Sequence, residues 1–233
     1  MNNFNYEEFE KNIGYQFKDQ GLLVTALTHT SYANEMKINK RECYERSEFL
    51  GDAILEYIVS DYLIRNYPDY SEGKLTKLRA SLVCEFTLSQ ISKELDFGTY
   101  VVLSKGEELT GGRNRDSIMC DLFESVLGAI YLDGGLEPAR RFVETHLLRD
   151  IEEKSLFYDA KSTLQEYVQK NGQSFRYELV SESGPDHHKS FKSRIIIDDV
   201  QIAEGTGHSI KNAEQSAAYN ALIILREQDK TEL

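Results

Sequence analysis

Apolar residues in the first two thirds of the chain recur with the three-to-four-residue period of amphipathic helices. Strand-like alternation of apolar and polar residues is almost absent before residue 153. Pro138 begins the predicted helix over 138–151, and the first turn of a helix is a position that favours proline. The pattern predicts an all-α domain over residues 1–153, with helices over 21–28, 46–66, 75–95, 117–132 and 138–151.

The pattern changes after residue 153. Residues 154–158 are assigned to a short linker, and a helix follows over 160–170. Alternation then begins at Phe175 and again at Phe191, with turns expected at Gly184-Pro185 and Asp198-Asp199. A third strand over 200–203 and an Ala-rich helix over 209–226 complete an αβββα order. This predicts an α+β domain over residues 159–228.

Three carboxylates gather in the segment YERSEFLGDA, residues 44–53. Glu45, Glu48 and Asp52 have the spacing i, i+3, i+7, which in a helix places them on one stripe within roughly 60° of each other. The same stripe continues to Leu55 and Val59, so the fold is expected to cover it. Acids on such a face repel one another unless a cation joins them, which favours a divalent metal over a solvated acidic helix edge.

A second acid pair, Asp121 and Glu124, repeats the i, i+3 spacing inside CDLFESVLGAIYLDGG. The residues around it are apolar on nearly every side, as in a buried central helix. A carboxylate there loses hydration unless it is paired or binds a metal, so the pair indicates a functional site. Glu72, at the start of a helical run, is a further candidate, although alone it is also typical of a first-turn acid that the helix dipole favours.

Four segments follow one another along the first domain: ERSEFLGD, SEGKLTKLRASLV, GEELTGGRNRDSI and DLFESVLGAIYLDGG. With IGYQFKD and ALTHTSYANE near the N-terminus, they resemble the ribonuclease III family of double-strand-specific endoribonucleases. One departure is Ser47, where the family usually has Leu; it lies between the acids and concerns packing or dimer fit more than chemistry. The resemblance implies metal binding by Glu48, Asp52, Asp121 and Glu124, of which Asp52 and Glu124 are catalytic, with supporting acids at Glu45 and Glu72.

The second domain resembles a double-stranded RNA-binding domain in its element order and in the segments LQEYVQ, GPDHHKSF and SIKNAEQSAAYNAL. Such domains read the shape of A-form RNA across two minor grooves and the phosphates between them. One departure is Ile210, because the family usually has two adjacent basic residues before the AEQ segment and a lost cation weakens phosphate binding. The resemblance implies minor-groove contacts by Ser162, Gln165, Glu166 and His187, and phosphate contacts by Lys189 and Lys211.

The acids and the resemblance together predict hydrolysis of phosphodiester bonds in double-stranded RNA. Mg²⁺, for which Mn²⁺ can substitute, prefers hard carboxylate ligands; in a two-metal mechanism one ion activates the attacking water and a second stabilises the leaving oxygen. The family implies products with 5′ phosphate and 3′ hydroxyl ends and a role in rRNA and mRNA processing. It also implies a homodimer, for which Phe49 and Leu50 are candidate contacts.

Two other functions fit parts of the sequence. A catalytically silent double-stranded RNA-binding protein would keep the fold, but all six acids are present. A helical metal-dependent phosphohydrolase acting on nucleotides would need only the acid cluster, and the RNA-binding pattern argues against it. The segment GGRNR, residues 111–115, has two interpretations: a basic loop that touches phosphate, or a plain solvated loop.

The net charge of −12 counts weakly against a nucleic-acid binder, because Lys and Arg normally neutralise the phosphates. Six acids belong to the predicted metal site, where bound cations invert the local field. Cys43, Cys84 and Cys120 form no CxxC pair, so reduced core thiols are expected. The N-terminal residues lack a signal-peptide pattern and no apolar run has membrane length, which predicts a cytoplasmic protein with no membrane partner.

Overall fold

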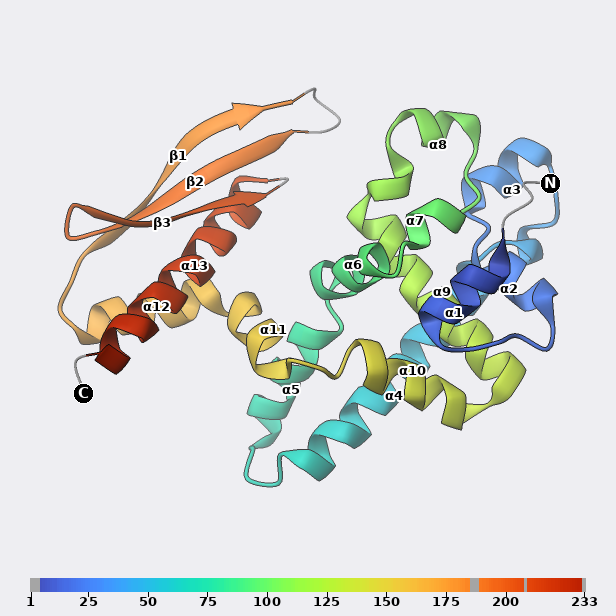
Figure 1. The fold of residues 1–233 in the computed structure, drawn as a ribbon, viewed down its shortest axis with the longest axis horizontal. Coiled ribbons are helices and arrows are strands. Elements are labelled where there is room, and N and C mark those ends of the chain that lie inside the picture. Colours follow the sequence, from blue (N-terminus) through green and yellow to red (C-terminus); the bar gives the residue numbers. More distant parts are fainter. Residues whose placement is uncertain (1–4, 185–188, 208, 232–233) are drawn as a thin grey trace. The chain divides into compact units, whose positions relative to one another are not determined.

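The computed structural model describes residues 5–184, 189–207 and 209–231 (Figure 1). The chain divides into two compact units, Met1–Ile151 and Glu152–Leu233. The first unit is built from helices, and the second carries a three-stranded sheet. The predicted fold class, an all-α domain followed by an αβββα domain, is confirmed. Within the described ranges, no helix has the length and apolar character that a membrane crossing requires.

The first unit consists of helices joined by short connections and two 3₁₀ turns, η1 and η2. In chain order these elements are α1 (Tyr6–Ile13), α2 (Gln20–Ala26), α3 (Thr30–Met36), η1 (Lys40–Glu42), α4 (Glu45–Asn66), α5 (Glu72–Leu82), α6 (Glu85–Glu94), α7 (Phe97–Tyr100), α8 (Lys105–Leu109), η2 (Gly112–Asn114), α9 (Asp116–Gly134) and α10 (Leu136–His146). The short helices α1, α3, α7 and α8 are absent from the sequence-based prediction, because so few turns show no clear apolar period.

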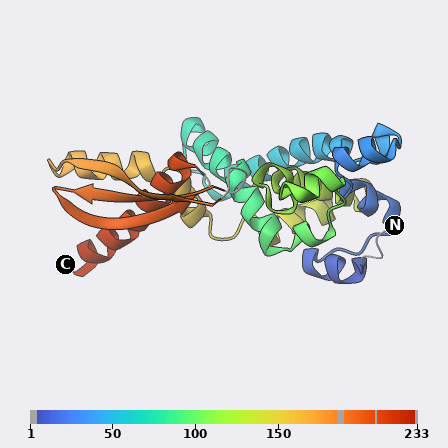
Figure 2. The same ribbon diagram turned by 90° about the horizontal axis from the view of Figure 1, so that it is seen from above.

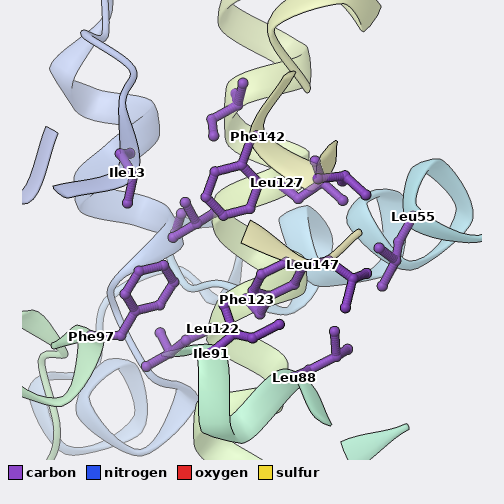
Figure 3. Close-up of a cluster of buried hydrophobic side chains, with 14 of the residues drawn as sticks. Ile13, Leu55, Leu88, Ile91, Phe97, Leu122, Phe123, Leu127, Phe142 and Leu147 are labelled. Atoms are coloured by element: carbon purple, nitrogen blue, oxygen red, sulfur yellow. The ribbon is translucent and has the colours of Figure 1, made fainter. Parts of the chain in front are cut away.

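Helix α9 forms the centre of the first unit. It packs against α2, α4, α6 and α10, and most of its residues between Ile118 and Ile130 are buried. Figure 3 shows Leu122, Phe123 and Leu127 of α9 within a cluster of apolar side chains from the surrounding helices. The rings of Phe123 and Phe142 have centroids 5.1 Å apart. The acids of α9 are therefore carried by a helix that the core surrounds, as its sequence indicates.

The prediction of one helix over residues 75–95 is wrong. Helix α5 ends at Leu82 and α6 begins at Glu85, and between them Cys84 has an extended backbone with φ −76° and ψ 154°. The carbonyl oxygen of Ser81, which a continuous helix would bond to a backbone N–H, accepts the hydroxyl of Thr87 over 2.8 Å. Short hydroxyl side chains compete with helical hydrogen bonds in this way, and apolar periodicity does not reveal it.

The helix predicted over 138–151 is also shorter in the structure. Helix α10 ends at His146, and Asp150 has a left-handed backbone with φ 53°, which a continuing right-handed helix does not allow. A further helix, α11 (Ile151–Tyr158), covers the residues assigned to the linker. Its Leu156 packs against the core of the second unit.

The second unit places two helices on one face of an antiparallel sheet in the order β1-β2-β3 (Figures 1 and 2). Asp198 and Asp199 join β2 to β3 with φ of 44° and 65°, the positive values typical of a two-residue type I′ turn. The strand after this turn extends to Gly207, beyond the predicted end at residue 203. The elements are α12 (Ala160–Lys170), β1 (Phe175–Ser183), β2 (Ser190–Ile197), β3 (Val200–Gly207) and α13 (Ile210–Thr231).

Candidate active site

Two glycines allow helices α4 and α9 to cross with their backbones in contact. A Cβ atom on Gly51 would lie 1.8 Å from the carbonyl oxygen of Glu124, and one on Gly128 would lie 2.1 Å from the carbonyl oxygen of Ser47. No other residue type fits at these positions without separating the helices. Ser47, the departure from the family pattern, is itself buried at this crossing. The close approach brings the acid-bearing faces of both helices together.

The crossing gathers three of the predicted acids into one cluster. Glu48 comes from α4, and Asp121 and Glu124 come from α9; one carboxylate oxygen from each lies within 4.8 Å of the others. All three residues are half-buried, so their oxygens are shielded by the core but still reachable from solvent. Hard carboxylate oxygens at this spacing are the ligands that Mg²⁺ and Mn²⁺ prefer.

Burial and mutual repulsion disfavour the charged forms of the carboxylates in this cluster. Burial, together with the charges of Asp121, Glu45 and Asp52, raises the pKa of Glu48 to about 7. Burial and the neighbouring acids, Asp52 and Glu48 foremost, raise the pKa of Glu124 to about 8. A bound divalent cation would reverse these shifts. The donor set and its electrostatics therefore fit a metal ion.

The remaining predicted acids lie at different distances from this cluster. Asp52 is exposed on α4, outside the three-residue cluster, and its charge raises the pKa of both Glu48 and Glu124. Glu45 is exposed at the first residue of α4, and its charge also raises the pKa of Glu48. Glu72 begins α5, where its exposed carboxylate accepts a hydrogen bond from the hydroxyl of Thr76 over 3.0 Å. The structure does not bring Glu72 into the three-residue cluster.

Comparisons with known proteins identify the family of both units. The family model described as Ribonuclease-III-like matches residues 19–151, and the Double-stranded RNA binding motif matches residues 160–225. Ribonuclease 3 of Bacillus cereus strain G9842 is 46% identical over 226 residues, covering 96% of this chain and 92% of that protein. The chain belongs to the ribonuclease III family. The predicted enzyme class, an endonuclease that acts on double-stranded RNA, is confirmed.

Solved structures place the nuclease unit in the same family. Two structures of the ribonuclease III nuclease domain of Campylobacter jejuni match with a TM-score of 0.56. They are 39% and 40% identical to this chain and cover 62% and 66% of it, with 99% and 96% of their own chains matched. One of them is described as showing structural flexibility in a region involved in dimer formation.

The residues predicted to contact RNA occupy two helices and a hairpin of this ribonuclease III family chain. Ser162, Gln165 and Glu166 are exposed on one side of α12, opposite the buried Leu164 and Val168. Lys211 is exposed in the first turn of α13, and Ile210 before it is also exposed. Lys189 directly precedes β2 and forms an ion pair with Glu182 of β1. His187 lies outside the described residues.

The arginine side chains of the loop at residues 111–115 have partners within the first unit. Arg113 pairs with Glu108 and donates to the carbonyl oxygens of Gly98 and Val101 over 2.8 and 3.0 Å. Arg115 pairs with Glu107. Both guanidinium groups therefore serve the packing of η2 and α8, and a phosphate would have to compete with these partners.

Two residues near the acids were missed by the sequence-based prediction. Tyr44 donates a hydrogen bond from its hydroxyl to Oδ2 of Asp121 over 2.8 Å. Glu56 raises the pKa of Glu124 through its charge and pairs with Arg79 over 2.9 Å. Glu56 stands four residues after Asp52, as Asp52 does after Glu48, so extending the stripe of acids along the helix finds it. Tyr44 directly precedes Glu45, but its contact with α9 leaves no signal in the spacing.

Proposed function

We propose that this chain hydrolyses phosphodiester bonds in double-stranded RNA with divalent cations held where α4 crosses α9. The observation that carries the proposal is the convergence of Glu48, Asp121 and Glu124, whose oxygens lie within 4.8 Å of one another. The raised pKa values of Glu48 and Glu124 support it, because they reflect negative charge that a cation would neutralise. Membership of the ribonuclease III family supplies the substrate class.

The proposed roles of the acids follow from their positions. Glu48, Asp121, Glu124 and Asp52 hold the metal, and Asp52 and Glu124 act in the chemical step, while Glu45 and Glu72 are supporting acids. Mg²⁺, or Mn²⁺ in its place, supplies a Lewis acid and an activated water at neutral pH. The carboxylates orient this chemistry towards an in-line displacement. The proposed products carry 5′ phosphate and 3′ hydroxyl ends.

The second unit is proposed to hold the duplex. The exposed side chains of Ser162, Gln165 and Glu166 can face a minor groove, and His187 is proposed to reach a second one. Lys211 stands at the start of α13, where free backbone amides also favour phosphate. Lys189 is proposed as a second phosphate contact, which requires it to exchange Glu182 for the anion.

A catalytically silent double-stranded RNA-binding protein is the alternative. Such a protein would have no need to hold half-buried acids together against their mutual repulsion. The six predicted acids are all retained in this sequence, and three of them share one cluster. These observations favour the enzyme.

The decisive experiment is incubation of a labelled RNA duplex with the full chain in Mg²⁺ and, separately, in excess chelator. We expect fragments of defined length in Mg²⁺ and intact duplex in chelator, with binding to the duplex retained in both. The product ends are checked by phosphatase treatment and by ligation. Single-stranded RNA of the same sequence serves as the control substrate. Equal cleavage in chelator, or no cleavage in any divalent cation, would contradict the proposal.

A homodimer is proposed from an apolar stripe on α4. Phe49, Tyr57 and Ile64 are exposed by 82%, 51% and 64%, and Ala53 between them is exposed too. At 100° per residue these four positions fall within about 80° of the helix surface. Exposed apolar stripes of this kind mark protein interfaces. Two subunits would place two acid clusters on one duplex.

We expect Phe49→Glu to convert the dimer to a monomer, because it puts a charge at the most exposed apolar side chain of the stripe. Sedimentation velocity of the full chain measures the change, with a sedimenting mass that falls from two chains to one. Leu109→Glu is the matched control, since Leu109 on α8 is equally exposed at 84% but lies outside the stripe. A dimer that survives Phe49→Glu, or dissociates equally with Leu109→Glu, would exclude this face.

The biological setting proposed for the enzyme is the processing of rRNA and mRNA in the cytoplasm. Cys43, Cys84 and Cys120 are all free thiols, as in a reducing compartment. We propose rRNA and mRNA as substrates on the basis of the family. The RNA-facing residues do not identify a transcript, because recognition of RNA shape carries little sequence information.

A further inference from the structure

A buried tyrosine reaches into the acid cluster from the residue before α4. The hydroxyl of Tyr44 donates a hydrogen bond to Oδ2 of Asp121 over 2.8 Å. The tyrosine residue is 3% exposed and Asp121 is half-buried, so the bond lies in a partly buried setting. A hydrogen bond from a neutral donor to a carboxylate in such surroundings is stronger than one on the surface.

The rest of the fold holds Tyr44 in place. Its backbone N–H donates to the carbonyl oxygen of Thr28 over 2.9 Å. Its ring packs edge-on against His29, with centroids 5.3 Å apart. His29 is anchored in turn, because its backbone N–H donates to the carbonyl oxygen of Val102 over 3.0 Å. The backbone and ring of Tyr44 are therefore held against Thr28 and His29, the residues between α2 and α3, and this fixes the position of the hydroxyl.

We propose that Tyr44 is a positioning residue that orients Asp121 for metal binding. A carboxylate held at one oxygen can still offer the other to a cation, and the hydrogen bond restricts rotation of the Asp121 side chain. Without the hydroxyl, Asp121 would be free to turn away from Glu48 and Glu124, which repel it. This inference rests on the proposed function, since it assigns Tyr44 a role in the same metal site.

The competing explanation is that the bond only satisfies a buried hydroxyl and stabilises the fold. The chain offers a matched comparison on the same helix. The hydroxyl of Tyr15 donates to Oδ2 of Asp133 over 2.6 Å, also in a partly buried setting. Asp133 is twelve residues beyond Asp121, roughly 18 Å along α9, so Tyr15 has the same chemistry away from the acids.

The test compares Tyr44→Phe with Tyr15→Phe in the full chain. Each variant loses one tyrosine–aspartate hydrogen bond and keeps the aromatic ring. Mn²⁺ binding is followed by the electron paramagnetic resonance signal of the free ion, without RNA, and the thermal unfolding midpoint is measured in parallel. We expect Tyr44→Phe to weaken Mn²⁺ binding about tenfold or more, and Tyr15→Phe to bind Mn²⁺ as the wild type does.

Cleavage assays supply the second readout. In Tyr44→Phe the Mg²⁺ concentration for half-maximal cleavage should rise by the same factor, with the rate largely restored at saturating Mg²⁺ and duplex binding in chelator unchanged. Wild-type Mn²⁺ affinity in Tyr44→Phe, or an equal loss in Tyr15→Phe, would overturn the inference and leave the proposed function intact. Failure of the wild type itself to bind Mn²⁺ or cut duplex RNA would instead reject the proposed function.

Discussion

Replacing Glu124 with Gln should lower the rate of duplex RNA cleavage by about 1,000-fold or more and leave RNA binding nearly unchanged. A loss of that size is about 4 kcal/mol in the barrier. The substitution keeps the shape of the side chain and removes one anionic ligand from the cluster of Glu48, Asp121 and Glu124. The proposed RNA contacts belong to the second unit and are untouched.

The same substitution should raise the thermal stability of the metal-free protein. Burial and neighbouring acids raise the pKa of Glu124 to about 8, so its charge is held against repulsion in the folded state. Because the carboxyl ionises near its ordinary value of 4.5 in the unfolded chain, this cost to folding grows above that pH and is complete above about 8, and a neutral amide removes it. Loss of activity together with equal or higher stability would separate a ligand role from a folding defect.

Rates are measured on a labelled duplex at several Mg²⁺ concentrations, and binding is measured by gel shift in chelator. Glu144→Gln is the matched control, because Glu144 is exposed on α10 and does not belong to the cluster of Glu48, Asp121 and Glu124. Wild-type cleavage by Glu124→Gln at low millimolar Mg²⁺ would remove Glu124 from the site.

The acid pairs could be found from the sequence because a helix converts spacing into a shared face. Glu45, Glu48 and Asp52 fall on α4, and Asp121 and Glu124 on α9, where the periodicity places them. The spacing carries no information about the meeting of the two helices, which depends on a long-range contact between Gly51 and Gly128. The hydrogen bond from Tyr44 to Asp121 is missed for the same reason.

The errors in the helix boundaries have a local cause. At Cys84 the hydroxyl of Thr87 takes the carbonyl of Ser81, and between α10 and α11 the left-handed backbone of Asp150 prevents one continuous helix. Neither feature changes the spacing of the apolar residues, so the periodicity predicts a continuous helix at both places. In the second unit, by contrast, the turn at Asp198-Asp199 was predicted because its residue types tolerate positive φ.

Gly51→Ala should destabilise the nuclease unit by about 3 kcal/mol and abolish Mn²⁺ binding in whatever protein still folds. The added Cβ would lie 1.8 Å from the carbonyl oxygen and 2.6 Å from the carbonyl carbon of Glu124. Both atoms belong to backbone, so no rotamer change relieves the clash and α4 must move away from α9. That movement also separates Glu48 from Glu124, because the obstructed carbonyl and the ligand side chain belong to the same residue.

Gly73→Ala is the matched control, since Gly73 lies in α5 with open space around the position of a Cβ. There the substitution should be neutral or raise stability by up to about 1 kcal/mol, because alanine favours the helix and restricts the unfolded chain. Thermal unfolding followed by circular dichroism and Mn²⁺ titration measure both effects. Gly128→Ala, with its Cβ 2.1 Å from the carbonyl oxygen of Ser47, should reproduce the loss from the opposite helix. If both crossing variants keep wild-type stability and Mn²⁺ affinity, the acids do not depend on backbone contact between the helices.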